Sequence, residues 1–200
     1  MATTPLLVTA FLLALGVLWT VHGFLEQIVL VLRLMLRTPF RPPVRSPFDE
    51  TELKRRVGIG DCDPNLHMTN SRYLVIADEA RFDLFFRAGF GAALRRGMRT
   101  LVGSTCIRYR RDLPIIQPYT VRTRLLGWDD KWLYLENRFV RDGRTAVHLL
   151  SKSMPVGAEG KVPPAVFLEE LFGPGLPPSP ELPENVRVLL QGSDTLMSPD

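Results

Sequence analysis

The chain has 200 residues, of which 46% are hydrophobic, and a formal net charge of +4 at pH 7. This length suits one ordinary domain with additional segments, and the hydrophobic content excludes a wholly disordered chain. The weak positive charge is scattered in short groups, so no nucleic-acid partner is expected. Two cysteines and three widely spaced histidines show no metal-ligand spacing, and the sequence predicts no disulfide framework, metal or cofactor.

The first predicted element is a membrane segment. The twenty residues "LLVTAFLLALGVLWTVHGFL", 6–25, carry no formal charge and have the length needed to cross a bilayer core. A cleaved signal peptide is disfavoured because no basic residue precedes the run, and a buried core helix is the remaining alternative. We therefore expect residues 1–37 to form a transmembrane and juxtamembrane helix. Because basic residues follow the run and none precedes it, the chain is expected to be a single-pass membrane protein whose C-terminal domain is cytosolic.

The segment 38–50 contains "TPFRPPVRSP", with four prolines in ten residues, and is expected to be a stiff linker. A compact domain is predicted over residues 51–156. Beyond it, residues 157–200 form a proline-rich C-terminal extension, expected to be irregular.

The domain begins with a short predicted strand at 54–60. A helix is then expected to start near Asn70, because apolar residues recur at helical spacing as far as Leu84. From residue 100 to residue 156 the pattern alternates with period two, which predicts about four antiparallel strands, and Asp142-Gly143 is typical of a hairpin turn. One strand, one long helix and an antiparallel meander favour an α+β domain whose sheet wraps around its helix. Open strand edges would favour pairing with a second subunit.

Between the first strand and the helix lies "GDCDPNLHMTNSRY", residues 60–73. Asp63 stands shortly before the helix start, where unpaired backbone N–H groups and the helix dipole attract an oxyanion. A carboxylate at such a place can serve as a base toward water or as a nucleophile, which is the minimum equipment for acyl transfer. The same residues are also ordinary turn and capping chemistry, and His67 has a purely structural alternative.

The motif "GDCDP" followed by "HMTNSRY" and "ADEARFDLFFRAG" resembles the hotdog-fold thioesterases of the 4-hydroxybenzoyl-CoA thioesterase type. The whole chain is most similar to membrane-anchored relatives of thioesterase superfamily member six, which share the apolar N-terminal run, "HMxNxRYL" and "VRTRLLGWDD". The resemblance implies a hotdog fold, in which a five- or six-stranded antiparallel sheet wraps around one long helix, preceded here by the transmembrane helix.

The resemblance also implies site residues. The family's catalytic acid falls on Asp63 and not on Asp61, and its oxyanion donor, a backbone N–H, falls on or next to Asn70. His67 and Asn70 match the His and the second Asn of the family motif, whereas Tyr73 is expected to be a packing residue. Because the family's site lies between subunits, a homodimer or larger assembly is implied.

Two departures from the family pattern bear on the substrate. Thr69 replaces the first Asn of the motif, which still permits helix capping. Where relatives carry basic residues for coenzyme A phosphates, this chain reads Trp128-Asp129-Asp130-Lys131, and carboxylates repel phosphate. Arg108, Arg110, Arg111 or Lys131 could compensate, or they could be ordinary solvated residues. An acyl-carrier-protein substrate, or loss of activity, stays open.

The leading hypothesis is a membrane-anchored thioesterase that hydrolyses acyl-CoA or another acyl thioester, with Asp63, Asn70 and His67 as site residues. The membrane location would favour fatty acyl groups. The alternative is a non-catalytic acyl-lipid or acyl-CoA binding or scaffold protein on the same fold. A hydratase or dehydratase is a third possibility, disfavoured because His67 lacks an evident partner in the sequence.

Overall fold

The structure is a computed structural model and describes residues 3–184 and 186–190. The chain divides into two compact units, residues 1–40 and 41–200. The first unit holds helix α1 (Thr3–Arg37) and a 3-10 turn, η1 (Thr38–Phe40). The elements of the second unit are, in chain order, β1 (Thr51–Arg56), η2 (Ile59–Asp61), α2 (Asn70–Arg87), α3 (Phe90–Arg95), β2 (Arg99–Tyr109), β3 (Pro118–Trp128), β4 (Leu133–Arg141), β5 (Arg144–Gly157), β6 (Gly160–Lys161) and α4 (Pro164–Phe172).

The prediction of a membrane-spanning helix is wrong. Within residues 3–184 and 186–190, no helix is both long and apolar enough to cross a bilayer. The prediction depends on the absence of formal charge between Leu6 and Leu25, and an uncharged run does not by itself satisfy both conditions. Two further predictions depend on that helix: a membrane partner, and single-pass localisation with a cytosolic domain. Both are wrong for the same reason.

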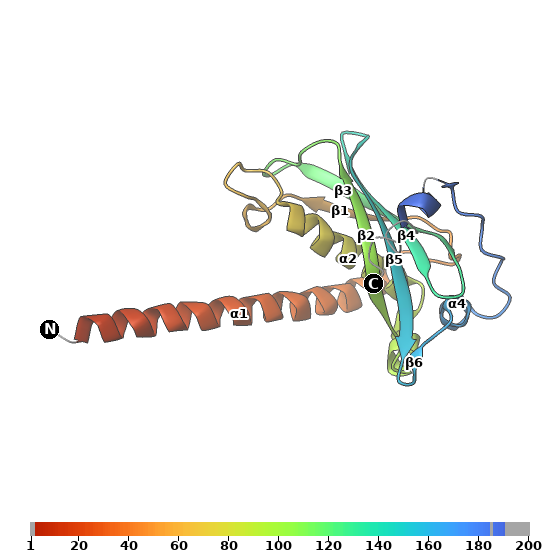
Figure 1. Cartoon of the computed structure of the whole chain (residues 1–200), viewed down its shortest axis with the longest axis horizontal. Helices are drawn as coiled ribbons and strands as arrows, with labels where there is room; N and C mark the ends of the chain where they lie inside the picture. Colours follow the sequence, from red (N-terminus) through yellow and green to blue (C-terminus); the bar gives the residue numbers. More distant parts are fainter. Residues whose placement is uncertain (1–2, 185, 191–200) are drawn as a thin grey trace, which may run out of the picture. The chain divides into compact units, whose positions relative to one another are not determined.

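The second unit contains an antiparallel sheet in the order β1-β3-β4-β5-β2, with the short β6 paired to β5. Figure 1 shows this sheet curving around α2, as the predicted hotdog arrangement requires. The hairpin between β4 and β5 turns at Asp142-Gly143, whose φ angles of 49° and 72° are those that an Asp-Gly pair tolerates. Strand β2 lies at one end of the order, so one of its edges has no strand partner among the described residues.

Helix α2 forms where apolar residues repeat at helical spacing, and it buries that face against the concave side of the sheet. Tyr73, Ile76 and Ala80 are nearly inaccessible and pack with Val121, Phe139 and other residues of the sheet. The helix ends at Arg87, and Gly89, with a φ of 103°, adopts the left-handed conformation that lets the chain turn into α3.

The C-terminal extension is more ordered than its proline content indicates. Helix α4 begins with Pro164 at its first position, where a missing N–H has no consequence, and it buries Phe167 and Leu168 beside Phe85. Further along, Val186 and Leu190 pack with Tyr134 and Leu150 of the sheet. The predicted boundaries at residues 37, 50 and 156 stay predictions.

Candidate functional site

The first aspartate of the motif is a buried anchor. Asp61 ends η2 and is 6% exposed. One carboxylate oxygen accepts the Gly58 amide at 2.9 Å, and the other accepts Arg72 Nε at 2.8 Å. Its carbonyl oxygen accepts the Thr69 amide at 2.9 Å. These contacts tie the motif loop to the first turn of α2, so both of the Asp61 carboxylate oxygens serve the fold.

The second aspartate, Asp63, lies in the loop between η2 and α2. Its Oδ1 accepts the Asn65 amide at 2.9 Å and the His67 amide at 3.5 Å, and the Asn65 side chain approaches Oδ2 at 3.4 Å. Burial by itself raises the pKa of Asp63, but these hydrogen bonds and nearby His67 outweigh it, and the pKa lies below its ordinary value. Asp63 is therefore ionised at neutral pH.

Asn70 is the first residue of α2. Thr69 is the N-cap, but its hydroxyl makes no capping hydrogen bond. Among the described residues, the Asn70 amide N–H has no hydrogen-bond partner. An unpaired N–H at the positive end of an eighteen-residue helix is suited to stabilise an oxyanion.

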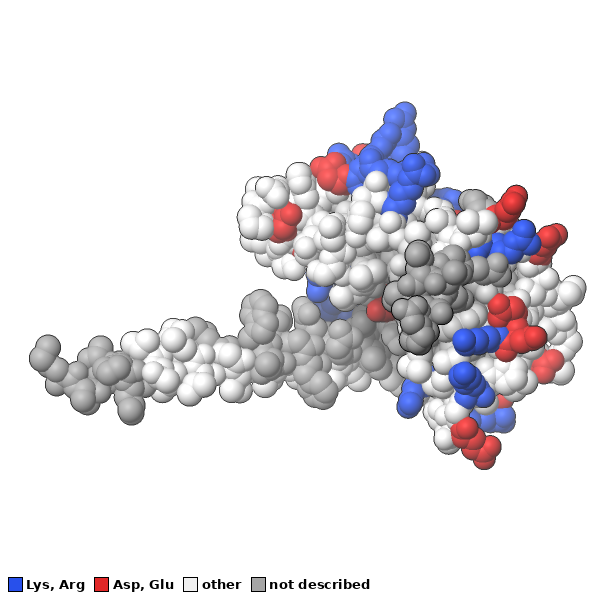
Figure 2. Space-filling model, in the orientation of Figure 1, with Lys and Arg blue, Asp and Glu red and all other residues white. Residues whose placement is uncertain are grey.

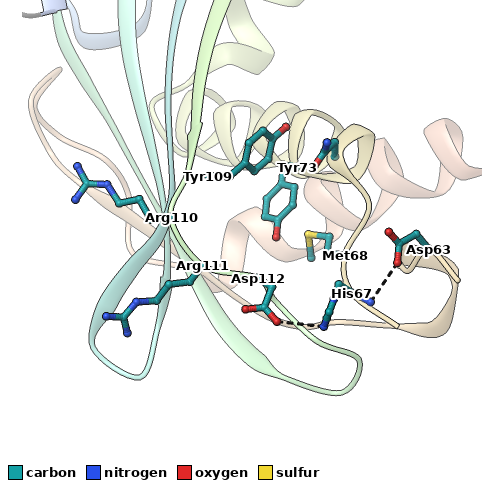
Figure 3. A pocket seen from close by; sticks show the side chains of 9 residues that line it. Asp63, His67, Met68, Tyr73, Tyr109, Arg110, Arg111 and Asp112 are labelled. Atoms are coloured by element: carbon teal, nitrogen blue, oxygen red, sulfur yellow. Dashed lines mark hydrogen bonds and ion pairs between the residues drawn. The ribbon is translucent and has the colours of Figure 1, made fainter. Parts of the chain in front are cut away.

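His67 faces a carboxylate from another part of the chain. Its Nε2 lies 3.1 Å from Oδ2 of Asp112, in the loop that follows β2 (Figure 3). That loop is joined to the motif by backbone hydrogen bonds, because the Met68 amide donates to the Leu113 carbonyl at 2.8 Å. Leu113 is fully buried and fixes the loop in the core.

These groups line one pocket with a volume of about 430 Å³. Tyr73 and Tyr109 form its aromatic side, with their rings edge to face at 5.5 Å. In Figure 3 the Arg110 and Arg111 side chains extend away from Asp63 and His67, on the far side of Asp112. The pocket is lined by Asp63, His67, Met68, Asn70, Tyr73, Tyr109, Arg110, Arg111 and Asp112.

The structure thus brings together Asp63, His67 and Asn70, the three site residues predicted from the sequence. Their catalytic roles stay predictions. Tyr73 is 2% exposed and packs as expected. Sequence reasoning missed Asp112 and Tyr109, since nothing in their local pattern indicates that the loop after β2 meets the motif.

Asp129, which the family resemblance places where relatives bind phosphate, has a local structural role. Its Oδ1 accepts the Lys131 and Trp132 amides at 2.8 and 2.7 Å, and its Oδ2 accepts the Tyr134 hydroxyl at 2.5 Å. The carboxylate therefore caps the turn between β3 and β4. As for metals, no group of three or more potential ligands is assembled in the part of the chain that the structure describes.

Residues 57–188 match the protein family described as the thioesterase-like superfamily. The chain belongs to this family. It is 34% identical over 189 residues to protein THEM6 of Xenopus laevis, which covers 92% of this chain and 88% of the relative. It is 43% identical over 106 residues to protein THEM6 of Danio rerio, a match that spans about half, 52%, of each chain.

Solved structures share the fold. A gentisyl-coenzyme A thioesterase superposes with a TM-score of 0.55 at 18% identity, over 61% of this chain and 99% of that one. A 4-hydroxybenzoyl-CoA thioesterase mutant complexed with 4-hydroxybenzoyl-CoA superposes with a TM-score of 0.55 at 18% identity, over 61% and 98%. The sequence-based recognition of a thioesterase family is confirmed, and the expectation of a thioester hydrolase agrees with it.

Proposed function

We propose that this chain hydrolyses an acyl thioester in the pocket lined by Asp63, His67 and Asn70. One observation carries the proposal: an ionised carboxylate and an unpaired helix N-terminal amide line the same cavity. The two groups are what acyl transfer requires, namely a nucleophile or base for the carbonyl carbon and a donor for the developing oxyanion.

In the reaction, the thioester carbonyl oxygen would accept the Asn70 N–H. Asp63 would then act on the carbonyl carbon in one of two ways. It either attacks directly, giving a mixed anhydride that water hydrolyses, or it removes a proton from an attacking water. In both routes the C–S bond breaks, and the products are a carboxylate and a thiol. Both routes need the ionised carboxylate, which the lowered pKa of Asp63 supports.

The substrate is proposed to be an acyl group on an anionic carrier, either coenzyme A or an acyl-carrier protein. Figure 2 shows Lys and Arg side chains gathered at the end of the domain where the β4–β5 hairpin lies. Among the described residues, the side chains of Arg110 and Arg111 make no hydrogen bond or ion pair, so they are free to meet a phosphate. The argument for fatty acyl groups depended on a membrane location and is withdrawn.

A homodimer is also part of the proposal. Strand β2 presents an eleven-residue edge, and its Leu101 and Val102 are about half exposed. Long exposed edges of this kind are usually paired or protected. Tyr109, the last residue of β2, lines the pocket. A second copy paired along β2 would therefore lie beside the pocket mouth.

The rival function is a non-catalytic acyl-thioester binding protein. It is favoured by the fact that Asp63 accepts amide hydrogen bonds from its own loop, as a purely structural turn aspartate does. A binding protein would raise its melting temperature with ligand yet release no thiol.

The test uses the full chain and a panel of acyl-CoA thioesters, with thiol release as the readout. Asp63→Asn is expected to lower kcat by about 100-fold or more, the range for loss of a general base or nucleophile, with little change in melting temperature. The matched control is Asp49→Asn, because Asp49 is an exposed aspartate that also accepts backbone amides but lies outside the pocket, and it should keep wild-type turnover. Near wild-type turnover of the Asp63 variant would refute the proposal, and thermal stabilisation without thiol release from the wild type would favour the rival.

A further inference from the structure

Asp112 is a carboxylate at the pocket that the proposed reaction does not use. It comes from the loop after β2, far from the motif in sequence, and its side-chain partner is His67. The side chains of the neighbouring Arg110 and Arg111 extend away from it (Figure 3), so it is not a counter-ion for them. Its position therefore needs another explanation.

Backbone contacts hold Asp112 in place on both sides. Its own carbonyl oxygen accepts Nη1 of Arg141 at 3.1 Å. After it, Leu113 accepts the Met68 amide, and the Ile115 amide donates to the Leu66 carbonyl at 2.8 Å. The two backbone hydrogen bonds of Leu113 and Ile115 join the two loops without the help of the His67–Asp112 pair. The His67–Asp112 pair is thus not required to hold the loops together, and the His67 side chain can take part in the reaction.

The contact decides which ring nitrogen is engaged. Nε2 of His67 lies 3.1 Å from the Asp112 carboxylate, which is close enough for a hydrogen on this nitrogen to be directed at the carboxylate. Nδ1 is left as the nitrogen that can serve a substrate. A carboxylate beside one nitrogen of an imidazole, with the other nitrogen left for the substrate, is the arrangement found where histidine transfers protons in acyl transfer.

We infer that Asp112 is a positioning residue, which holds His67 so that its Nδ1 protonates the departing thiolate; this rests on the proposed function. As the C–S bond breaks, the Nδ1 proton moves to sulfur, giving the free thiol and a neutral imidazole. The water that completes hydrolysis supplies the proton that restores the imidazolium, so the cycle balances. Asp63 and Asn70 act on the carbonyl, and His67 acts on the leaving group.

The test compares two thioesters of the same acyl group on the full chain. One carries coenzyme A, an alkyl thiol with a high pKa, and the other an aromatic thiol such as thionitrobenzoate, which leaves without a proton. Asp112→Asn is expected to lower kcat for the coenzyme A ester by about 10- to 100-fold, within the range of acid catalysis, and for the aromatic ester by less than about 3-fold. KM should change little, and Asp112→Glu should restore part of the loss.

Two further variants make the comparison secure. His67→Gln should show the same selective loss, and it leaves the loop after β2 unaltered in case the Asp112 variants fold poorly. Glu52→Gln is the matched control, because Glu52 is also an exposed, ion-paired carboxylate, here with Arg122, but lies in β1, outside the pocket. It should leave both rates unchanged.

The inference is overturned if the Asp112 or His67 variants lower both rates equally, or if they leave coenzyme A ester hydrolysis unchanged. In that event, a wild type that is active and sensitive to Asp63→Asn would leave the proposed function standing. A wild type that releases no thiol from either ester would overturn the proposed function, and the inference with it.

Discussion

Asp61 and Arg72 form an ion pair at 2.8 Å between the motif loop and the first turn of α2, with the Asp61 side chain only 9% exposed. The pair gives the two aspartates of "GDCDP" different roles. Asp61 holds the loop against the helix, whereas Asp63 faces the pocket. The consequences of replacing each residue should therefore differ in kind.

Asp61→Asn is expected to lower the free energy of unfolding by about 1–3 kcal/mol, because Arg72 loses its charged partner in a largely buried place. Asp63→Asn should lower it much less, because the Asn side-chain oxygen can still accept the Asn65 amide. Urea denaturation followed by circular dichroism measures both. An Asp61 variant as stable as the wild type would contradict the anchoring role.

The pH dependence of activity follows from the lowered pKa of Asp63. Asp63 should stay ionised down to about pH 4, the ordinary Asp value, so on the acidic side activity should fall only below that pH. The measurement is kcat/KM from about pH 3.5 to about pH 8, with circular dichroism as a control for unfolding. An acidic loss of kcat/KM with its midpoint above about pH 4 would contradict the assignment of Asp63 as the ionised group.

Glu136 should make stability depend on pH. Burial raises its pKa, but hydrogen bonds from His148 and Arg124, both at 2.7 Å, outweigh this and lower the pKa to about 2 from 4.5. The unfolded chain therefore binds the proton more readily, so the stabilisation is complete above about pH 4.5 and is lost as the pH falls toward 2.

Accordingly, Glu136→Gln should lower the free energy of unfolding by about 1–3 kcal/mol at pH 7, since charged hydrogen bonds are lost. The difference in free energy of unfolding between the variant and the wild type should narrow as the pH approaches 3, roughly midway between the unfolded and folded pKa values of Glu136. Urea unfolding at several pH values measures this. A difference in free energy of unfolding that stays constant with pH would show that the Glu136 charge does not cause the stabilisation.

Gly103 in β2 has no room for a side chain. A Cβ there would lie 2.4 Å from ring atoms of Trp132. Gly103→Ala is therefore expected to destabilise the fold by about 1–3 kcal/mol through overpacking. Gly60→Ala is the control, since a methyl group added at Gly60 would meet nothing within 4 Å. Equal melting temperatures for the two variants would contradict the prediction.

The proposed dimer can be tested at the edge of β2. Leu101→Glu combined with Val102→Glu places charges on this edge, which disfavours strand pairing. Light scattering should give twice the 22.6 kDa chain mass for the wild type and the chain mass for the variant. Thiol release should fall with dissociation, because the edge ends at the pocket. A monomeric wild type would refute the dimer.

Much of the domain could be predicted from local pattern. The apolar repeat from Tyr73 to Leu84 predicts α2, and the alternation after residue 100 predicts the meander, because each periodicity reflects one buried face. The motif spacing places Asp63 and Asn70 at the helix start. Helix α4 was missed because its prolines suggested irregular structure, although Pro164 occupies a position that a helix tolerates.

The sequence by itself determined the order of the first strand, the long helix and the antiparallel strands, together with the family motif, since these depend on residues that are neighbours along the chain. Only the tertiary structure decided which polar groups meet. Asp61 turns toward Arg72 and Asp63 toward the pocket, although they stand only two positions apart. Asp112 reaches His67 because the loop after β2 hydrogen-bonds to the motif loop. Contacts between distant segments depend on how the whole sheet closes around its helix, and no local pattern records that closure.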